Sequence, residues 1–208
     1  MAKTNSKKTF QAWDEYLQMA EKWRGRVIKH AIDVEDVMEL FIARHYIIAL
    51  TDKDYDEQIE SFRKTFFWQT EMKVSNKIKI VCRLVEQQEL EFSAHTPNSS
   101  VGEELTKIME CRNAMAHWQL DFSHKYRWFG AANKEMQLNK LNKFAKKPTN
   151  IYTESEIENI VTLCRKYTTL FLHWSGYPIQ DLLPKIYAAT KKRIEALTPD
   201  QRKLFGIE

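Results

Sequence analysis

Apolar residues recur at intervals of three or four positions through most of this chain, and this spacing limits the possible folds more than any other feature. Between residues 10 and 30 the pattern is carried by Phe10, Trp13, Leu17, Ala20 and Val27. Because an α-helix has 3.6 residues per turn, side chains spaced in this way share one helix face. Only five glycines and five prolines occur in 208 residues, too few for the many tight turns of a β-sandwich or barrel. The pattern therefore predicts an all-α protein.

Further helices follow from the same periodicity. One begins near Asp33, whose carboxylate can cap a helix start, after the first helix has ended near residue 30. Another spans residues 74–90, with its apolar side chains on one face. We expect its basic residues to lie on the opposite, solvated face. These residues are Lys77, Lys79 and Arg83.

Two helix starts match the capping box, in which a hydroxyl and a carboxylate three residues apart satisfy each other's backbone donors. The first is Ser100 with Glu103, and the helix that it opens should run to about His117. The second is Thr153 with Glu156, which opens another helix. These signals predict where two helices begin.

The remaining stretches are less regular. Residues 1–8 are polar and basic, and we expect a disordered lead-in rather than a secretory signal. Residues 120–150 could form an irregular insertion or a short hairpin. A break at residues 175–178 precedes a C-terminal helical tail. We expect residues 1–208 to form a single domain.

Composition limits the classes of function. A net charge of +4 permits an anionic partner without demanding one. Three widely separated cysteines indicate reduced thiols and a cytoplasmic location. Because no Cys-x-x-Cys pair, no histidine pair at ligand spacing and no glycine-rich phosphate loop occurs, we expect no metal and no cofactor. The most apolar stretch, residues 37–50, is too short and too charged to span a bilayer, so we expect no membrane association.

The most specific pattern is an Arg-Asn-x-x-x-His motif formed by Arg112, Asn113 and His117. Asn113 and His117 are four positions apart and project from one helix face, whereas Arg112 lies about 140° from His117 around the helix axis. Arg112 can therefore reach the same site only through its long side chain or through a frayed helix end. A guanidinium can grip phosphate with two hydrogen bonds, and a histidine can exchange protons near neutral pH. The alternative is a capping histidine beside a solvated arginine at a helix C-terminus.

The motif resembles the signature of HEPN domains, in which arginine and histidine are separated by four to six residues late in a helical bundle. The order of the surrounding helices also resembles that family over roughly residues 33–172. The resemblance implies an up-and-down helical bundle with additional N- and C-terminal helices. It also implies a metal-independent endoribonuclease of the toxin or phage-defence kind, with a composite site at a homodimer interface. Arg112 would stabilise the phosphate, His117 would act in acid–base catalysis, and Asn113 would position them or satisfy backbone groups between helices.

The resemblance leaves a second function open, because a HEPN domain could instead be a non-catalytic dimerisation or RNA-binding accessory module. Catalysis would favour the dimer, since one histidine cannot conveniently accept and supply a proton at once, and a symmetric pair supplies His117 twice. An antitoxin protein is a further candidate partner. In one subset of the family a tyrosine two positions after the histidine is modified, but Gln119 occupies that position here. The sequence therefore does not support that mode of silencing.

A basic and aromatic stretch follows the motif. It contains Arg127, Trp128, Lys143 and Lys146, whose charges could guide RNA phosphates and whose ring could stack on a base. The alternative is a solvated loop whose aromatic side chains fold back on the core. RNA is the expected partner, with these four residues as candidate contacts.

Overall fold

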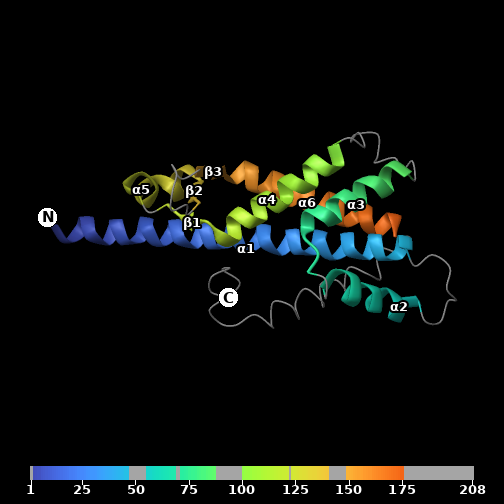
Figure 1. The fold of residues 1–208 in the computed structure, drawn as a ribbon. Helices are drawn as coiled ribbons and strands as arrows, with labels where there is room; N and C mark the ends of the chain where they lie inside the picture. Colours follow the sequence, from blue (N-terminus) through green and yellow to red (C-terminus); the bar gives the residue numbers. More distant parts are fainter. Residues whose placement is uncertain are drawn as a thin grey trace. The chain divides into compact units, whose positions relative to one another are not determined.

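The computed structural model describes residues 2–46, 55–68, 71–87, 100–121, 123–140 and 149–175 (Figure 1). Within these ranges the protein is mostly helical and carries a small antiparallel sheet. The helices are α1 (Ala2–Tyr46), α2 (Tyr55–Phe62), the π-helical segment η1 (Arg63–Trp68), α3 (Val74–Gln87), α4 (Val101–His117), α5 (His124–Asn133) and α6 (Glu154–Trp174). The strands are β1 (Gln119–Leu120), β2 (Glu135–Asn139) and β3 (Thr149–Thr153). The predicted C-terminal helical tail lies outside the described residues.

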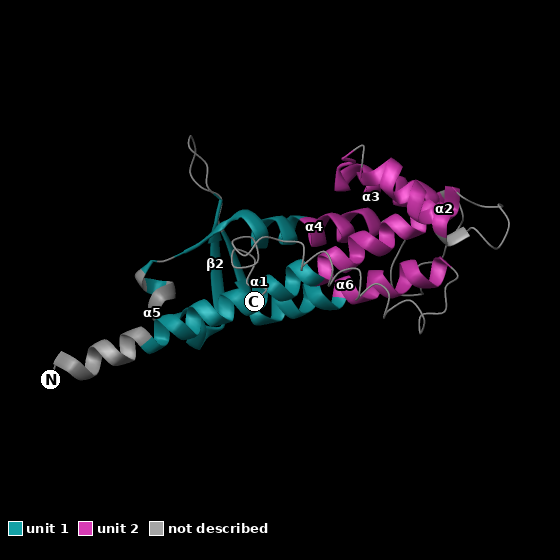
Figure 2. Ribbon diagram, turned by 90° about the horizontal axis from the view of Figure 1, so that it is seen from below, with its two compact units in different colours: residues 1–29, 110–162, 194–208 teal, residues 30–109, 163–193 magenta. Residues whose placement is uncertain are grey.

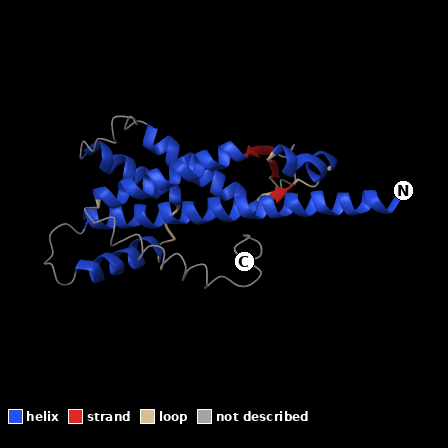
Figure 3. Ribbon diagram, turned by 180° about the vertical axis from the view of Figure 1, so that it is seen from behind, coloured by secondary structure: helices blue, strands red, loops and turns tan. Residues whose placement is uncertain are grey.

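The sheet corrects the expectation of an all-α protein in one segment. Its strands follow the order β1-β2-β3, and both pairs are antiparallel. Figure 3 shows strands in red among the blue helices. β2 pairs with β3 from Glu135 opposite Thr153 to Asn139 opposite Thr149, and α5 lies between β1 and β2 in sequence. Of the two alternatives for residues 120–150, the structure therefore contains the hairpin pairing, together with a helix that the sequence pattern did not predict.

The chain divides into two compact units (Figure 2). Unit 1 comprises residues 1–29, 110–162 and 194–208, and unit 2 comprises residues 30–109 and 163–193. The sheet and α5 belong to unit 1, whereas α2, η1 and α3 belong to unit 2. The helices α1, α4 and α6 each contribute residues to both units.

α1 differs from the sequence expectation at both places where a boundary was predicted. It begins at Ala2, within the segment for which the sequence predicts disorder. It also continues through Asp33, so the prediction of a helix start at this residue is wrong. Asp33 is buried, and its Oδ2 lies 3.7 Å from Nδ1 of His30, one turn earlier. Because a partner within the helix is available, this carboxylate does not have to cap backbone donors.

The predicted starts of α4 and α6 agree with the structure. α4 spans Val101–His117, and α6 follows Thr153 directly. At α6 the backbone N–H of Thr153 donates to Oε2 of Glu156 at 2.8 Å, and the N–H of Glu156 donates to Oγ1 of Thr153 at 3.3 Å. This reciprocal pair is the expected capping box.

Unit 1 packs α5 closely against α1. Tyr16 of α1 is fully buried, and its hydroxyl donates to the carbonyl of Asp121 at 3.4 Å. A Cβ added to Gly130 of α5 would lie only 2.5 Å from Cδ2 of the Tyr16 ring. Glycine at position 130 therefore allows the backbone of α5 to approach the Tyr16 ring more closely than any larger residue would permit. Met136 and Leu138 of β2 add fully buried side chains to this core.

Unit 2 has an aromatic core. The rings of Phe41 and Phe171 are stacked with centroids 5.5 Å apart, and Trp174 lies 5.8 Å from Phe41. Phe67 of η1 is buried as well. None of the described helices combines the length and the apolar character that crossing a membrane requires.

Candidate functional site

The three polar residues of the motif lie near the C-terminal end of α4, within unit 1. Asn113 and His117 are exposed to solvent, and Arg112 is half-buried. The residues between and before them are buried in the core of the unit: Cys111, Ala114, Met115 and Ala116. Because these buried residues anchor the helix, the polar side chains are presented outward from a packed support.

Arg112 reaches the exposed face of α4 through its side chain. Its Nη1 donates to Oδ1 of Asn113 at 3.0 Å. α4 remains helical through His117, so the alternative of a frayed helix end is wrong. Asn113 lies one turn before His117 and shares its face. The structure therefore brings Arg112 into contact with Asn113 and places Asn113 beside the position of His117.

His117 makes no hydrogen bond or ion pair with another residue in the part of the chain that the structure describes. Its imidazole is exposed in the last turn of α4. A side chain in this environment is accessible to a ligand or to a second copy of the chain.

The end of α4 is held by Arg24 of α1, a residue that the sequence did not single out. Its Nε donates to the carbonyl oxygen of Met115 at 2.6 Å, and its Nη2 donates to that of Trp118 at 3.3 Å. The last carbonyls of a helix have no partner within the helix and carry partial negative charge, so a guanidinium suits this position. Burial lowers the pKa of Arg24, and the charge of Glu21 opposes that shift. No local pattern points to Arg24, because its partners lie 91 and 94 positions later in the chain.

β3 supports α4 beside the motif. The phenol of Tyr152 lies close enough to Cys111 for the cysteine to affect its pKa, and Nδ2 of Asn150 donates to the Tyr152 hydroxyl at 3.2 Å. Burial raises the pKa of Tyr152 to about 12, and Cys111 raises it further while the bond from Asn150 lowers it. The phenol is therefore neutral at physiological pH and links the sheet to the helix residue that precedes Arg112.

The four candidate RNA contacts are not tested by the structure. Arg127 and Trp128 lie in α5, but their side chains are outside the described residues. Lys143 and Lys146 lie outside the described residues altogether. These four residues stay predictions.

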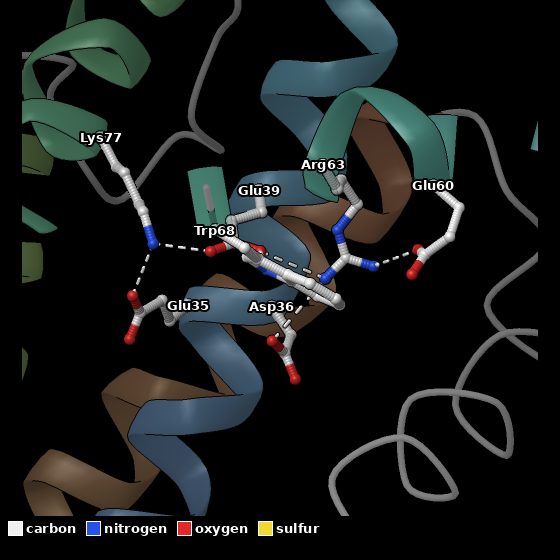
Figure 4. Close-up of polar contacts among 7 residues, drawn as sticks. All are labelled: Glu35, Asp36, Glu39, Glu60, Arg63, Trp68 and Lys77. Atoms are coloured by element: carbon white, nitrogen blue, oxygen red, sulfur yellow. Dashed lines mark hydrogen bonds and ion pairs between the residues drawn. The ribbon is translucent and has the colours of Figure 1, made fainter. Parts of the chain in front are cut away.

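A second polar cluster, in unit 2, is built around Lys77 of α3 (Figure 4). Lys77 is only 4% exposed, so the prediction that it lies on a solvated helix face is wrong. Its Nζ donates to Oε1 of Glu35 at 2.7 Å and to Oε1 of Glu39 at 2.6 Å, both on α1. Two carboxylates therefore compensate the burial of one ammonium group.

Arg63 of η1 joins the same cluster from the other side (Figure 4). Its guanidinium lies 3.3 Å from Glu39, 3.7 Å from Asp36 and 3.3 Å from Glu60. The indole nitrogen of Trp68 also donates to Glu39 at 3.3 Å. Glu39 thus receives contacts from three side chains, and the cluster links α1, α2, η1 and α3.

Among the described residues, no group of three or more histidine, cysteine, aspartate or glutamate side chains is arranged to hold a metal ion. No family model, no curated protein and no solved structure matches the chain.

Proposed function

We propose that this protein is a HEPN-type, metal-independent endoribonuclease of the toxin or phage-defence kind, and that it acts as a homodimer. The observation that carries the proposal is the hydrogen bond from Arg112 to Asn113 on the exposed helix face that also bears His117. This bond would turn a phosphate-binding guanidinium toward the face of α4 that bears a group suited to proton transfer. The resemblance of the motif to the HEPN signature supports the same conclusion.

Each residue has a role that its chemistry suits. The guanidinium of Arg112 has five N–H donors, so an arginine can hold an asparagine side chain and grip a phosphate at the same time. It would stabilise the charge that develops on the phosphate in the transition state. Asn113 would hold Arg112 in this orientation through its side-chain oxygen. His117 would transfer protons.

The proposed reaction is an internal transesterification. The ribose 2′-oxygen attacks the adjacent phosphorus and gives its proton to His117. The bond from phosphorus to the 5′-oxygen breaks, and the leaving 5′-oxygen takes a proton from the partner subunit's His117. The products are a 2′,3′-cyclic phosphate and a free 5′-hydroxyl. Because one imidazole would have to serve as base and acid in the same step, a two-fold dimer that supplies two copies suits the reaction.

The experiment compares the wild type with His117→Ala on a fluorophore- and quencher-labelled single-stranded RNA of randomised sequence, with a chelator present. Loss of a general acid–base group should lower the cleavage rate by about 10²- to 10⁴-fold. The matched control is His173→Ala, which removes an exposed histidine from the last turn of α6 and should cleave like the wild type.

Two further measurements complete this experiment. Sedimentation should show the same dimer for the wild type and for His117→Ala. Because His117 is exposed, its removal should change the free energy of unfolding by no more than about 0.5 kcal/mol. Equal cleavage by both proteins, or no cleavage by the wild type, would contradict the proposal. If His117→Ala weakened RNA binding or dimerisation but did not change the cleavage rate, the result would favour the non-catalytic accessory module instead.

A further inference from the structure

We propose that Arg24 is the positioning residue of the site, which fixes the last turn of α4 and thereby the placement of the His117 imidazole. The inference rests on the proposed function for its effect on catalysis, but its structural part concerns only α1 and α4. It assigns a role in the site to the N-terminal part of the chain, which lies outside the range of the HEPN resemblance.

The two carbonyl groups that Arg24 binds flank His117 in sequence. Met115 lies two positions before the histidine, and Trp118 lies one position after it. One planar guanidinium therefore bridges the last turn of the helix across the residue that bears the imidazole. The shorter bond, at 2.6 Å, goes to a fully buried residue, and Trp118 is half-buried.

The physical reason for such a device is the weakness of helix ends. The last turn of an α-helix has carbonyl groups without intrahelical partners, and these turns fray. A cation at the C-terminus stabilises the helix through its dipole and satisfies the carbonyls directly. Catalysis depends on placement, since a displacement of about 1 Å can cost about 10²-fold in rate. His117 stands in the very turn that Arg24 holds.

Arg26 provides a matched control. It lies two positions further along α1 and also makes contacts to another helix of unit 1, because its guanidinium binds Glu158 of α6 at 2.5 and 2.9 Å. Replacing either arginine removes one positive charge and two hydrogen bonds from the same helix. Of these two arginines, Arg24 binds the end of α4, whereas Arg26 binds α6.

The experiment compares Arg24→Ala, Arg24→Lys and Arg26→Ala with the wild type by two readouts. The first is amide hydrogen exchange of the peptide that covers residues 116–119. Arg24→Ala should speed this exchange by about tenfold or more, because the last turn loses its cap. Arg26→Ala should leave it unchanged. Arg24→Lys keeps the charge but cannot bind both carbonyls with a planar fork, so its exchange should be intermediate.

The second readout is the kinetics on the randomised RNA probe. Arg24→Ala should lower kcat by about 10- to 100-fold and leave KM within about threefold, since phosphate binding by Arg112 is retained. Arg24→Lys should recover part of kcat. Arg26→Ala should match the wild type. If Arg24 had a purely structural role, Arg24→Ala would lose activity only as far as its folded fraction falls, and kcat per folded molecule would be unchanged.

The outcomes separate this inference from the proposed function. If the wild type cleaves RNA but Arg24→Ala has normal kcat and normal exchange, or if Arg26→Ala shows the same changes, the inference is overturned. If the wild type cleaves no RNA, the proposed function fails, and the exchange comparison alone decides whether Arg24 holds the turn that bears His117. If Arg24→Ala does not fold, Arg24→Lys carries both readouts, and values equal to the wild type in both overturn the inference.

Discussion

The cluster around Lys77 in unit 2 and the motif at the end of α4 in unit 1 are both built from charged and polar side chains on helices, yet they differ in burial. Lys77 and Glu39 are 4% and 2% exposed, and each contacts oppositely charged partners. Asn113 and His117 are exposed. A buried charge is tolerated only when a partner compensates its lost hydration, so the charged groups around Lys77 serve to compensate one another. Exposed groups at a helix end can meet a ligand.

The comparison implies that the two regions should respond oppositely to substitution. Removing a member of the buried cluster should lower the free energy of unfolding and leave the rate of RNA cleavage per folded molecule unchanged. Removing a member of the motif should lower the rate of RNA cleavage and leave the free energy of unfolding unchanged.

The largest effect on stability is expected for Lys77→Ala, which leaves the carboxylates of Glu35 and Glu39 without their ammonium partner. Breaking a buried ion pair in this way costs about 3–5 kcal/mol of unfolding free energy. Urea denaturation followed by circular dichroism measures the loss. The control is Lys79→Ala, which removes an exposed lysine from the same helix and should change stability by no more than about 0.5 kcal/mol. If Lys77→Ala had normal stability but reduced RNA cleavage per folded molecule, the buried cluster would belong to the functional site, contrary to this prediction.

An intermediate effect is expected for Asn113→Ala. Arg112 loses the acceptor that orients it, so RNA cleavage should fall by about tenfold, in line with the loss of one orienting contact. The free energy of unfolding should stay the same or rise by about 0.5 kcal/mol, because alanine is the better helix former at an exposed position. Asn159→Ala makes the same change at an exposed position of α6 and should affect cleavage little. Unchanged cleavage by Asn113→Ala would show that Asn113 has no role in the site.

The smallest effect concerns Tyr152, which supports the motif from β3. Its pKa is raised to about 12 in the folded protein, chiefly by burial, whereas an ordinary tyrosine titrates near 10. Between about pH 10 and pH 12 the unfolded chain therefore loses this proton while the folded chain keeps it, so stability falls as the pH rises through this window. Tyr152→Phe should show a shallower alkaline loss than the wild type in urea denaturation at pH 9, 10 and 11. Parallel slopes for the two proteins would mean that the Tyr152 phenol is not held neutral by the fold.

Local sequence signals predicted the parts of the fold that depend on neighbouring residues. The reciprocal hydrogen bonds of Thr153 and Glu156 join residues three positions apart, and the bounds of α4 follow from the periodicity of its own side chains. Asp33 shows the limit of such signals. An aspartate can cap a helix or lie within one, and here Asp33 lies within α1, 3.7 Å from His30.

Contacts between distant segments could not be predicted from one sequence. Lys77 fits a solvated helix face by its spacing, and only the carboxylates of Glu35 and Glu39, about forty positions earlier, explain its burial. The helix α5 packs Gly130 against Tyr16, which no pattern within α5 reveals. At the candidate site, the sequence indicated Arg112, Asn113 and His117 but not the residues that hold the helix beneath them.

The capping of α4 by Arg24 has a consequence for any attempt to transfer the motif to another protein. A peptide of the 17 residues of α4 would be largely unfolded in water, because most helical stability in proteins comes from packing. It would also lack Arg24, which lies 91 positions before Met115, and the contact of Cys111 with Tyr152. A graft that keeps the motif in its native geometry would therefore have to carry three segments that are distant in sequence: α1 around Arg24, α4 itself, and β3.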